Sequence, residues 1–72
     1  MRLRQVFGTN LERLRRERGL SQEDLAHAAG LERSYVGKLE NARFSASLDT
    51  IEKLSVALSV PAIAFLEERE AN

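Results

Sequence analysis

Residues 20–41 read LSQEDLAHAAGLERSYVGKLEN, two short helical patterns separated by Gly30. Ser21 is a favourable cap for the start of the first helix, and Asp24, three residues on, can reach back to support that cap. Gly30 is suited to end the helix because glycine adopts the left-handed conformation without a steric penalty. The stretch therefore predicts two helices joined by a tight turn.

We expect these helices over Gln22–Ala29 and Glu32–Glu40, each with one apolar face. Apolar side chains three and four residues apart lie on the same side of a helix, so the two faces can pack against each other. Two helices joined by a short turn that contains glycine form a helix-turn-helix motif. The apolar positions are Leu25, Ala26 and Ala29 in the first helix and Tyr35, Val36 and Leu39 in the second.

The opposite face of the second helix is polar. It carries Arg33, Ser34, Gly37 and Lys38. A polar helix face of this kind fits the major groove of DNA, where side chains can reach the edges of the bases. The alternative is an ordinary pair of helices with a charged face in water, and the spacing of the residues is compatible with both.

Several motifs within residues 7–66 carry a resemblance to a known family, among them RGLSQ at 18–22, AGL at 29–31, RSY at 33–35 and LEN at 39–41. Through these motifs, the sequence resembles the Cro/cI-type helix-turn-helix family of bacterial and phage transcription regulators. The resemblance implies an all-α, lambda repressor-like fold of five short helices. It also implies sequence-specific binding of double-stranded DNA by a homodimer, on an inverted-repeat operator. One departure is Ala42, where the family often has glycine.

Three further helices are expected outside this stretch. The first covers about Leu3–Glu17, where apolar residues recur at spacings of three and four, and Gly19 ends it. The fourth begins after the cap residue Ser47, and Pro61 suits the first position of a short fifth helix. Phe44, in the connection before Ser47, is expected to fill the core beneath the loop. The expected buried stripes are Leu3, Phe7, Leu11 and Leu14 in the first helix and Leu48, Ile51, Leu54 and Leu58 in the fourth.

Length and composition narrow the class of protein. The 72 residues are enough for one domain, and we expect residues 1–72 to form a single helix-turn-helix domain. The chain has no cysteine, so disulfides and thiolate metal sites are excluded. No apolar run approaches the ~20 residues of a membrane span, and the first residues lack the apolar segment of a secretion signal. We therefore expect a cytoplasmic protein.

The formal net charge is zero, but the charges are unevenly distributed. Residues 1–19 carry six arginines against two glutamates, whereas residues 44–72 carry a net charge of −3. A chain with a basic beginning and an acidic end can present one positive face to DNA. The same asymmetry is also compatible with solvated helix faces that bind nothing.

The side-chain chemistry and the resemblance together select candidate DNA contacts. Arg33 can donate two hydrogen bonds to a guanine edge, and Lys38 can reach a neighbouring base or a phosphate. Glu32 can accept from cytosine or interact with the helix dipole. For Gln22 the resemblance implies a phosphate contact, and its amide can also brace a side chain of the second helix. The full set is Gln22, Glu32, Arg33, Ser34, Tyr35, Lys38, Asn41 and Arg43, with the last two in a loop that straddles the DNA backbone.

The resemblance also implies one buried ion pair and one dimer interface. Arg15 is expected to pair with Glu40 and so to tie the first helix to the recognition helix. A guanidinium and a carboxylate can form two parallel hydrogen bonds, which fix their relative orientation. The last helix is too apolar to bury all its side chains in so thin a core. The expected dimer interface consists of Val60, Pro61, Ile63 and Ala64.

The sequence fits two other function classes, an enzyme and a protein-interaction module, to different degrees. An enzyme is disfavoured, because His27 is the only histidine and the sequence has neither a glycine-rich phosphate loop nor a plausible pair of catalytic carboxylates. We expect no cofactor and no metal. A protein-interaction module, for example an antitoxin-like partner, remains open because of the zero net charge. Among regulators, the absence of a sensor region favours a restriction–modification controller, with phage Cro-like repressors and antitoxins as alternatives.

Overall fold

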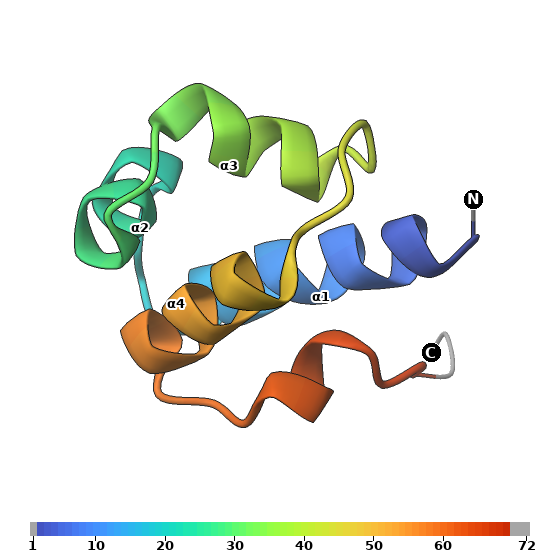
Figure 1. Ribbon diagram of the computed structural model, residues 1–72. Coiled ribbons are helices and arrows are strands. Elements are labelled where there is room, and N and C mark those ends of the chain that lie inside the picture. Colours follow the sequence, from blue (N-terminus) through green and yellow to red (C-terminus); the bar gives the residue numbers. More distant parts are fainter. Residues whose placement is uncertain (1, 70–72) are drawn as a thin grey trace.

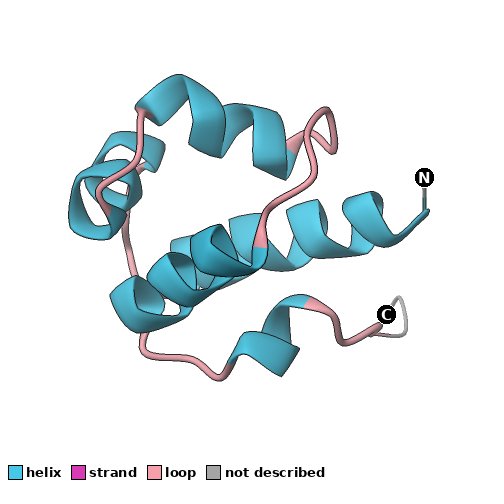
Figure 2. Ribbon diagram, viewed as in Figure 1, coloured by secondary structure: helices cyan, strands magenta, loops and turns pink. Residues whose placement is uncertain are grey.

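The computed structural model describes residues 2–69; Met1 and residues 70–72, which include Glu70 of the acidic end, lie outside the described chain. Helices joined by short loops make up this part of the chain, and no strand occurs in it (Figures 1 and 2). The all-α prediction is therefore confirmed. The elements are α1 (Arg2–Glu17), α2 (Gln22–Ala29), α3 (Arg33–Glu40), α4 (Leu48–Leu58) and the short 3-10 helix η1 (Ala62–Phe65).

The prediction of five helices is wrong for the fifth one. Four α-helices are present in residues 2–69, and the expected fifth is the four-residue 3-10 helix η1. Its backbone N–H groups bond three residues back, from Ala64 to Pro61 at 3.0 Å and from Leu66 to Ile63 at 2.9 Å. Pro61 stands at the cap, one position before the predicted one, with φ −68° and ψ 149°. The segment is too short for the four-residue spacing of an α-helix, and 3-10 turns are the usual solution at that length.

Packing places α3 at an edge of the molecule. Helix α3 contacts α1 and α2, whereas α4 contacts α2, and η1 contacts both α1 and α4. In Figure 1, α3 lies across the top of the molecule, with α1 and α4 below it. One side of α3 is thus covered by other helices, and its outer side faces solvent.

The core is built from apolar side chains of all five elements. Phe65 of η1 is fully buried and its ring centroid lies 5.4 Å from that of Phe7 on α1, so the 3-10 helix closes the core from below. Two predicted core positions are wrong, since Leu48 is 83% exposed and Leu3 is 46% exposed. Both stand in the first turn of their helices, where the neighbouring elements cover them only in part or not at all. The side chains with the greatest burial are Leu11, Leu25, Val36, Leu39, Leu54, Leu58 and Phe65.

The start of α2 has the cap that the sequence predicted. The Ser21 hydroxyl accepts from the backbone N–H of Asp24 at 3.0 Å, and the Asp24 carboxylate accepts from the backbone N–H of Ser21 at 3.1 Å. These bonds lower the pKa of Asp24 below its ordinary value. The capping contact therefore supports the fold above the ordinary carboxyl pKa and is lost as the pH falls through the lowered one.

All four α-helices end in the same backbone motif, a residue in the left-handed conformation followed by a reversed hydrogen bond. In this Schellman motif the N–H of the residue after the left-handed one bonds to a carbonyl five positions back. The observed bonds run from Leu20 to Arg15, Leu31 to Ala26, Arg43 to Lys38, and Val60 to Ser55. The left-handed residues are Gly19, Gly30, Ala42 and Ser59. Two of these ends therefore use a residue that carries a Cβ, at a steric cost.

The segment after η1 returns along α1. The Asn10 side-chain amide donates to the backbone carbonyls of Phe65 and Glu67, each at 2.8 Å, and Arg2 forms an ion pair with Glu68. Asn10 is buried, so these bonds satisfy a polar group that would otherwise be costly to bury. As a result, the two ends of the described chain lie on the same side of the molecule (Figure 1).

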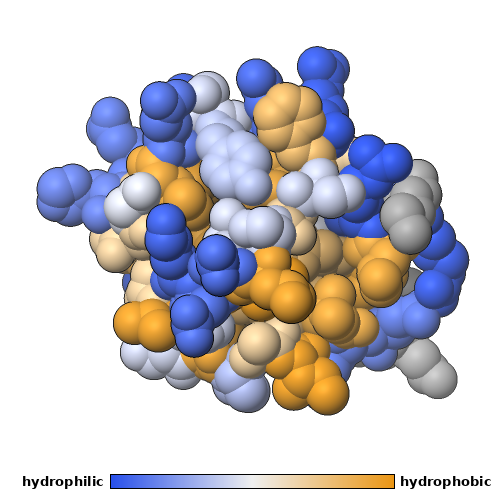
Figure 3. All heavy atoms as spheres, in the orientation of Figure 1, coloured by the Kyte–Doolittle hydropathy of each residue, from blue (hydrophilic) through white to orange (hydrophobic). Residues whose placement is uncertain are grey.

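The surface seen in Figure 3 separates hydrophilic and hydrophobic regions. Hydrophobic residues gather in the lower half of this face, over α4 and η1, and hydrophilic residues predominate along the upper edge, over α2 and α3. None of the helices in residues 2–69 has both the length and the apolar character needed to cross a membrane.

Candidate nucleic-acid interface

The outer side of α3 presents the predicted base-reading side chains to solvent. Arg33, Ser34 and Lys38 are all exposed, and Val36 and Leu39 on the inner side are fully buried. No hydrogen bond to another part of the described chain engages the Arg33 or Ser34 side chain. Side chains in this state can bond to base edges without first breaking an internal contact.

Glu32 lies just before α3, whereas the sequence predicted it as the first residue of the helix. It occupies the cap position with φ −80° and ψ 144°, and its side chain makes no capping hydrogen bond. Its exposed carboxylate remains near the positive end of the helix dipole and beside Arg33.

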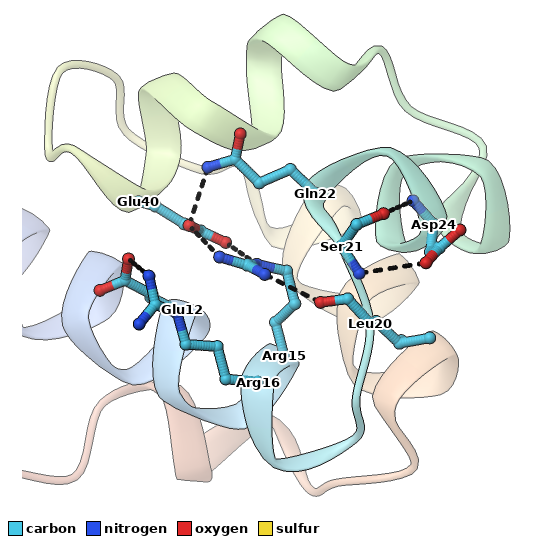
Figure 4. Close-up of polar contacts among 8 residues, drawn as sticks. All are labelled: Glu12, Arg15, Arg16, Leu20, Ser21, Gln22, Asp24 and Glu40. Atoms are coloured by element: carbon cyan, nitrogen blue, oxygen red, sulfur yellow. Dashed lines mark hydrogen bonds and ion pairs between the residues drawn. The ribbon is translucent and has the colours of Figure 1, made fainter.

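A buried ion pair joins α1 to the end of α3, and Figure 4 shows its geometry. Arg15 Nε donates to Glu40 Oε2 at 2.6 Å, and Arg15 Nη2 donates to Glu40 Oε1 at 3.1 Å. The two side chains are only 9% and 2% exposed. The remaining Arg15 nitrogen, Nη1, donates to the Leu20 carbonyl at 2.8 Å. The hydrogen bonds with Glu40 raise the pKa of Arg15, so the guanidinium stays charged at every accessible pH.

Gln22 belongs to the same network. Its amide Nε2 donates to Glu40 Oε1 at 3.0 Å, so Glu40 accepts bonds from two different helices (Figure 4). Of the two roles considered for Gln22, the structure contains the internal brace. The side chain is half-buried at the start of α2, next to Gly37 of α3: a Cβ added at Gly37 would lie 3.5 Å from the Gln22 amide oxygen. That distance is an ordinary contact, so the backbone packing does not require glycine at position 37.

Gly8 is a positioning residue that the sequence analysis did not identify. A Cβ at Gly8 would lie 2.6 Å from the carbonyl oxygen of Glu40 and 2.7 Å from that of Leu39. Only glycine lets α1 approach the end of α3 this closely. From the sequence, Gly8 is only a residue that weakens the helix interior. No local signal distinguishes it from an exposed glycine.

The loop after α3 carries the predicted phosphate contacts. Asn41 and Arg43 are exposed, and the left-handed residue between them is Ala42, with φ +61°. Asn41, whose residue type adopts the left-handed conformation more readily than alanine, has φ −89° and an ordinary backbone conformation. The departure from glycine at position 42 therefore leaves the turn in place, with a strained alanine at its centre.

Phe44 does not fill the core, which corrects the prediction made for it. Its side chain is 47% exposed and lies against Tyr35 and Lys38, with the two ring centroids 6.2 Å apart and Lys38 Nζ 5.0 Å from the Phe44 centroid. Tyr35 is half-buried at the edge of the same face. The left-handed turn at Ala42 directs the chain back over α3, and Phe65 already closes the core.

The predicted dimer residues lie around η1, away from α3. Ile63 is 66% exposed and Pro61 is exposed, while Val60 and Ala64 are half-buried. Arg18, just after α1, fixes this region by donating from Nε to the Leu58 carbonyl at 2.9 Å. Within residues 2–69, no group of histidine, cysteine or acidic side chains has the arrangement of a metal site.

Comparison with known proteins identifies the family. The model of the helix-turn-helix family HTH_3 matches residues 11–65, which include α2, α3, α4 and η1. This chain belongs to the helix-turn-helix family HTH_3. Members of the family are DNA-binding transcription regulators, which agrees with the solvent-facing polar side of α3.

Three similar proteins illustrate the range of the family. The chain is 42% identical over 64 residues to a hypothetical transcription factor of Neisseria meningitidis, covering 89% of this chain but only 60% of that relative. It is 40% identical to the control protein C.MunI of a Mycoplasma species, with 75% of this chain and 74% of the relative covered. Among solved structures, the restriction–modification controller protein C.AhdI from Aeromonas hydrophila superimposes with a TM-score of 0.84 at 44% identity, covering 86% and 94% of the two chains.

Proposed function

We propose that this helix-turn-helix protein binds an inverted-repeat operator as a homodimer and regulates transcription as a restriction–modification controller does. The observation that carries the proposal is the state of α3. Its outer side chains are exposed, and those of Arg33 and Ser34 make no hydrogen bond to another part of the described chain. Its far end is held by the buried network of Arg15, Gln22 and Glu40. A rigid helix with an open polar face can hold base-reading groups in register with the groove.

Base reading is assigned to α3. Arg33 contacts guanine through two hydrogen bonds, and Ser34 and Lys38 contact neighbouring bases or phosphates. Arg33 stands in the first turn of α3, which is the end of a recognition helix that reaches the base edges in this motif. Glu32 adds an acceptor beside it, and Tyr35 contributes its hydroxyl at the rim of the face.

Phosphate binding is assigned to the residues that flank this face. Asn41 and Arg43 are exposed on the loop after α3, and Gln22 stands at the N-terminal turn of α2. The amide of Gln22 retains a free oxygen when Nε2 is bonded to Glu40, and the first turn of α2 adds unpaired backbone N–H groups. These contacts orient the protein on the duplex without reading its sequence.

Dimerisation is assigned to the apolar surface of η1. Val60, Pro61, Ile63 and Ala64 form an apolar group on a surface remote from α3. A two-fold dimer through this surface would place two α3 helices in successive major grooves, about 34 Å apart. The similarity to two control proteins of restriction–modification systems supports the choice of a controller.

Selection from a random pool of duplexes tests the proposed function. We expect the wild-type protein to enrich an inverted repeat and to bind it with a steep dependence on salt. Arg33→Ala should weaken binding by about 1–3 kcal/mol and relax preference at one position in each half-site. Arg43→Ala should weaken binding to all duplexes alike, and Lys53→Ala on α4 provides a control that also removes one positive charge. No enrichment, or enrichment unchanged by Arg33→Ala, would contradict the assignment.

Sedimentation tests the dimer separately. Ile63→Asp should produce a folded monomer, because a charge at an exposed apolar position disturbs an interface but not the core. Its binding to the enriched repeat should fall far more than its binding to a single half-site. A variant that remains a dimer would remove η1 from the interface.

A protein-interaction module is the second candidate, favoured by the exposed apolar residues of η1 and the zero net charge. Retention on a heparin column distinguishes a DNA-binding regulator from a protein-interaction module. A DNA-binding protein with a basic face is retained at low salt, whereas a module for protein partners with no basic face elutes in the void volume.

A further inference from the structure

The loop between α3 and α4 holds an aromatic ring against the DNA-facing side of α3. Lys38 Nζ lies 5.0 Å from the centroid of the Phe44 ring, within the range of a cation–π contact. The Tyr35 ring lies against the same side chain, with centroids 6.2 Å apart and an angle of 54° between the planes. Phe44 is 47% exposed, so burial in the core does not account for its position.

The backbone of the loop produces this arrangement. The N–H of Arg43 bonds to the Lys38 carbonyl at 2.9 Å, and the N–H of Ala42 bonds to the Leu39 carbonyl at 3.2 Å. With Ala42 in the left-handed conformation, the chain reverses at the end of α3. Phe44 therefore comes back over the last turns of the helix, where Tyr35 and Lys38 stand three residues apart on one side.

Phe44 and the candidate DNA contacts line the same hollow. A depression of about 440 Å³ on the outer side of α3 is lined by Glu32, Ser34, Tyr35, Lys38 and Phe44, among others. On its other side Phe44 borders an apolar groove that includes Leu3, Ile51 and Leu66. The ring is therefore supported from behind and presents its face to the Lys38 ammonium group.

A fixed position of the ammonium group matters for binding. A lysine on an exposed helix has a flexible four-carbon stem and loses much rotamer freedom when it contacts DNA. A ring face that already attracts the cation reduces the number of conformations to be lost. The ring can thus strengthen the contact of Lys38 with DNA without touching the DNA.

We propose that Phe44 is a positioning residue for Lys38, and that it increases affinity for DNA by holding the ammonium group over the outer side of α3. The inference rests on the proposed function, since it concerns the same face. To the proposed DNA-binding face the inference adds Phe44, a residue that neither reads a base nor binds a phosphate. Phe44→Leu is the informative variant, because leucine keeps the apolar contact with the groove and removes the ring face.

The first test uses the free protein. Protons held above an aromatic ring face are shifted upfield in NMR spectra, so the Lys38 side-chain methylene protons next to Nζ should be shifted upfield relative to those of Lys53 on α4. Phe44→Leu should abolish the difference and Phe44→Tyr should retain it. Lys38 and Lys53 signals at the same position in the wild-type protein would overturn the inference, whatever the protein binds.

The second test is a double-mutant cycle on the duplex that the wild-type protein enriches from a random pool. Phe44→Leu should weaken binding about two- to five-fold, the strength of an exposed cation–π contact. The same change made in Lys38→Met should have less than half that effect on the free energy, because the cation is gone. An equal loss in both backgrounds would overturn the inference.

Two further observations keep the outcomes distinct. Leu48→Ala, which removes another exposed apolar side chain outside the hollow, should leave binding unchanged. If the wild-type protein enriches no duplex, the proposed function fails, and the NMR comparison still decides whether Phe44 positions Lys38. If a duplex is enriched but the cycle shows no coupling, only the role of Phe44 is lost.

Discussion

The C-terminal ends of α3 and α4 have the same backbone motif but are held in different ways. Each ends in a left-handed residue that is not glycine, Ala42 in one and Ser59 in the other. Each is also held by an arginine from the α1 region, Arg15 within the helix or Arg18 just after it. Arg15 reaches Glu40 at the end of α3, and Arg18 reaches the Leu58 carbonyl at the end of α4.

The difference lies in burial and in the charge of the acceptor. Arg15 is buried and faces a buried carboxylate, whereas Arg18 is exposed and faces a neutral carbonyl. A buried ion pair fixes geometry, and removing one partner leaves an uncompensated charge. An exposed contact with a helix end is worth much less. The end of the proposed recognition helix is thus the more firmly held of the two.

Breaking the buried pair should have the largest effect. Glu40→Gln should destabilise the fold by roughly 3–5 kcal/mol, because one amide oxygen cannot accept from Arg15 and Gln22 as two carboxylate oxygens do. The free energy of unfolding in urea measures the loss. Glu17→Gln, which removes an exposed partner of Arg13, should change stability little. Equal stability of Glu40→Gln and wild type would show that the pair does not hold α3.

The close approach at Gly8 should give the next largest effect. Gly8→Ala should destabilise by about 1–3 kcal/mol or more, because the new Cβ would overlap backbone carbonyls that cannot move aside. Gly37→Ala is the matched control, since a Cβ there meets only ordinary contacts and alanine favours the helix by about 0.5–1 kcal/mol. If both variants are stabilised in thermal unfolding, the contact between α1 and α3 is looser than described.

The exposed counterpart should matter less. Arg18→Ala should cost about 1 kcal/mol or less, the value of a cation near an exposed helix C-terminus. Arg16→Ala is the comparison variant, because Arg16 pairs with Glu12 on the exposed surface of α1. Chemical unfolding of the two variants compares their losses of stability. A loss for Arg18→Ala as large as that for Glu40→Gln would remove the distinction between the two helix ends.

The smallest effects should come from the two left-handed residues. Ala42→Gly and Ser59→Gly should each stabilise the protein by about 0.5 kcal/mol, since relief of about 1–2 kcal/mol of backbone strain is partly cancelled by the greater freedom of glycine in the unfolded chain. Differential scanning calorimetry should detect both as a higher Tm. A lower Tm for Ala42→Gly would mean that the alanine methyl group packs favourably in the loop.

Much of the fold was predictable because its signals are local. The bounds of α2 were predicted from a cap at Ser21 and a glycine at position 30, and both act through bonds within a few residues. The start of α4 followed from Ser47 in the same way, and its hydroxyl accepts from the Thr50 N–H at 3.0 Å. The pairing of Arg15 with Glu40 came from the resemblance to a family, not from any local pattern.

The errors concern contacts between distant parts of the chain. Periodicity places Leu48 on the same stripe as Leu54, but it does not say where the neighbouring helices stop. For Phe44, hydrophobicity predicts burial, and only the direction of the loop shows that the ring lies on α3. The role of Gly8 depends on carbonyls more than thirty residues away.

By itself, the sequence determined the order of the α-helices, the caps at Ser21, Gly30 and Ser47, and the polar side of α3, because these follow from side chains and backbone bonds within one or two turns. The tertiary structure alone decided which exposed apolar residues stay outside the core, how closely α1 approaches α3, and where the Phe44 ring comes to rest. Those properties depend on the distance between elements, which short-range patterns do not encode.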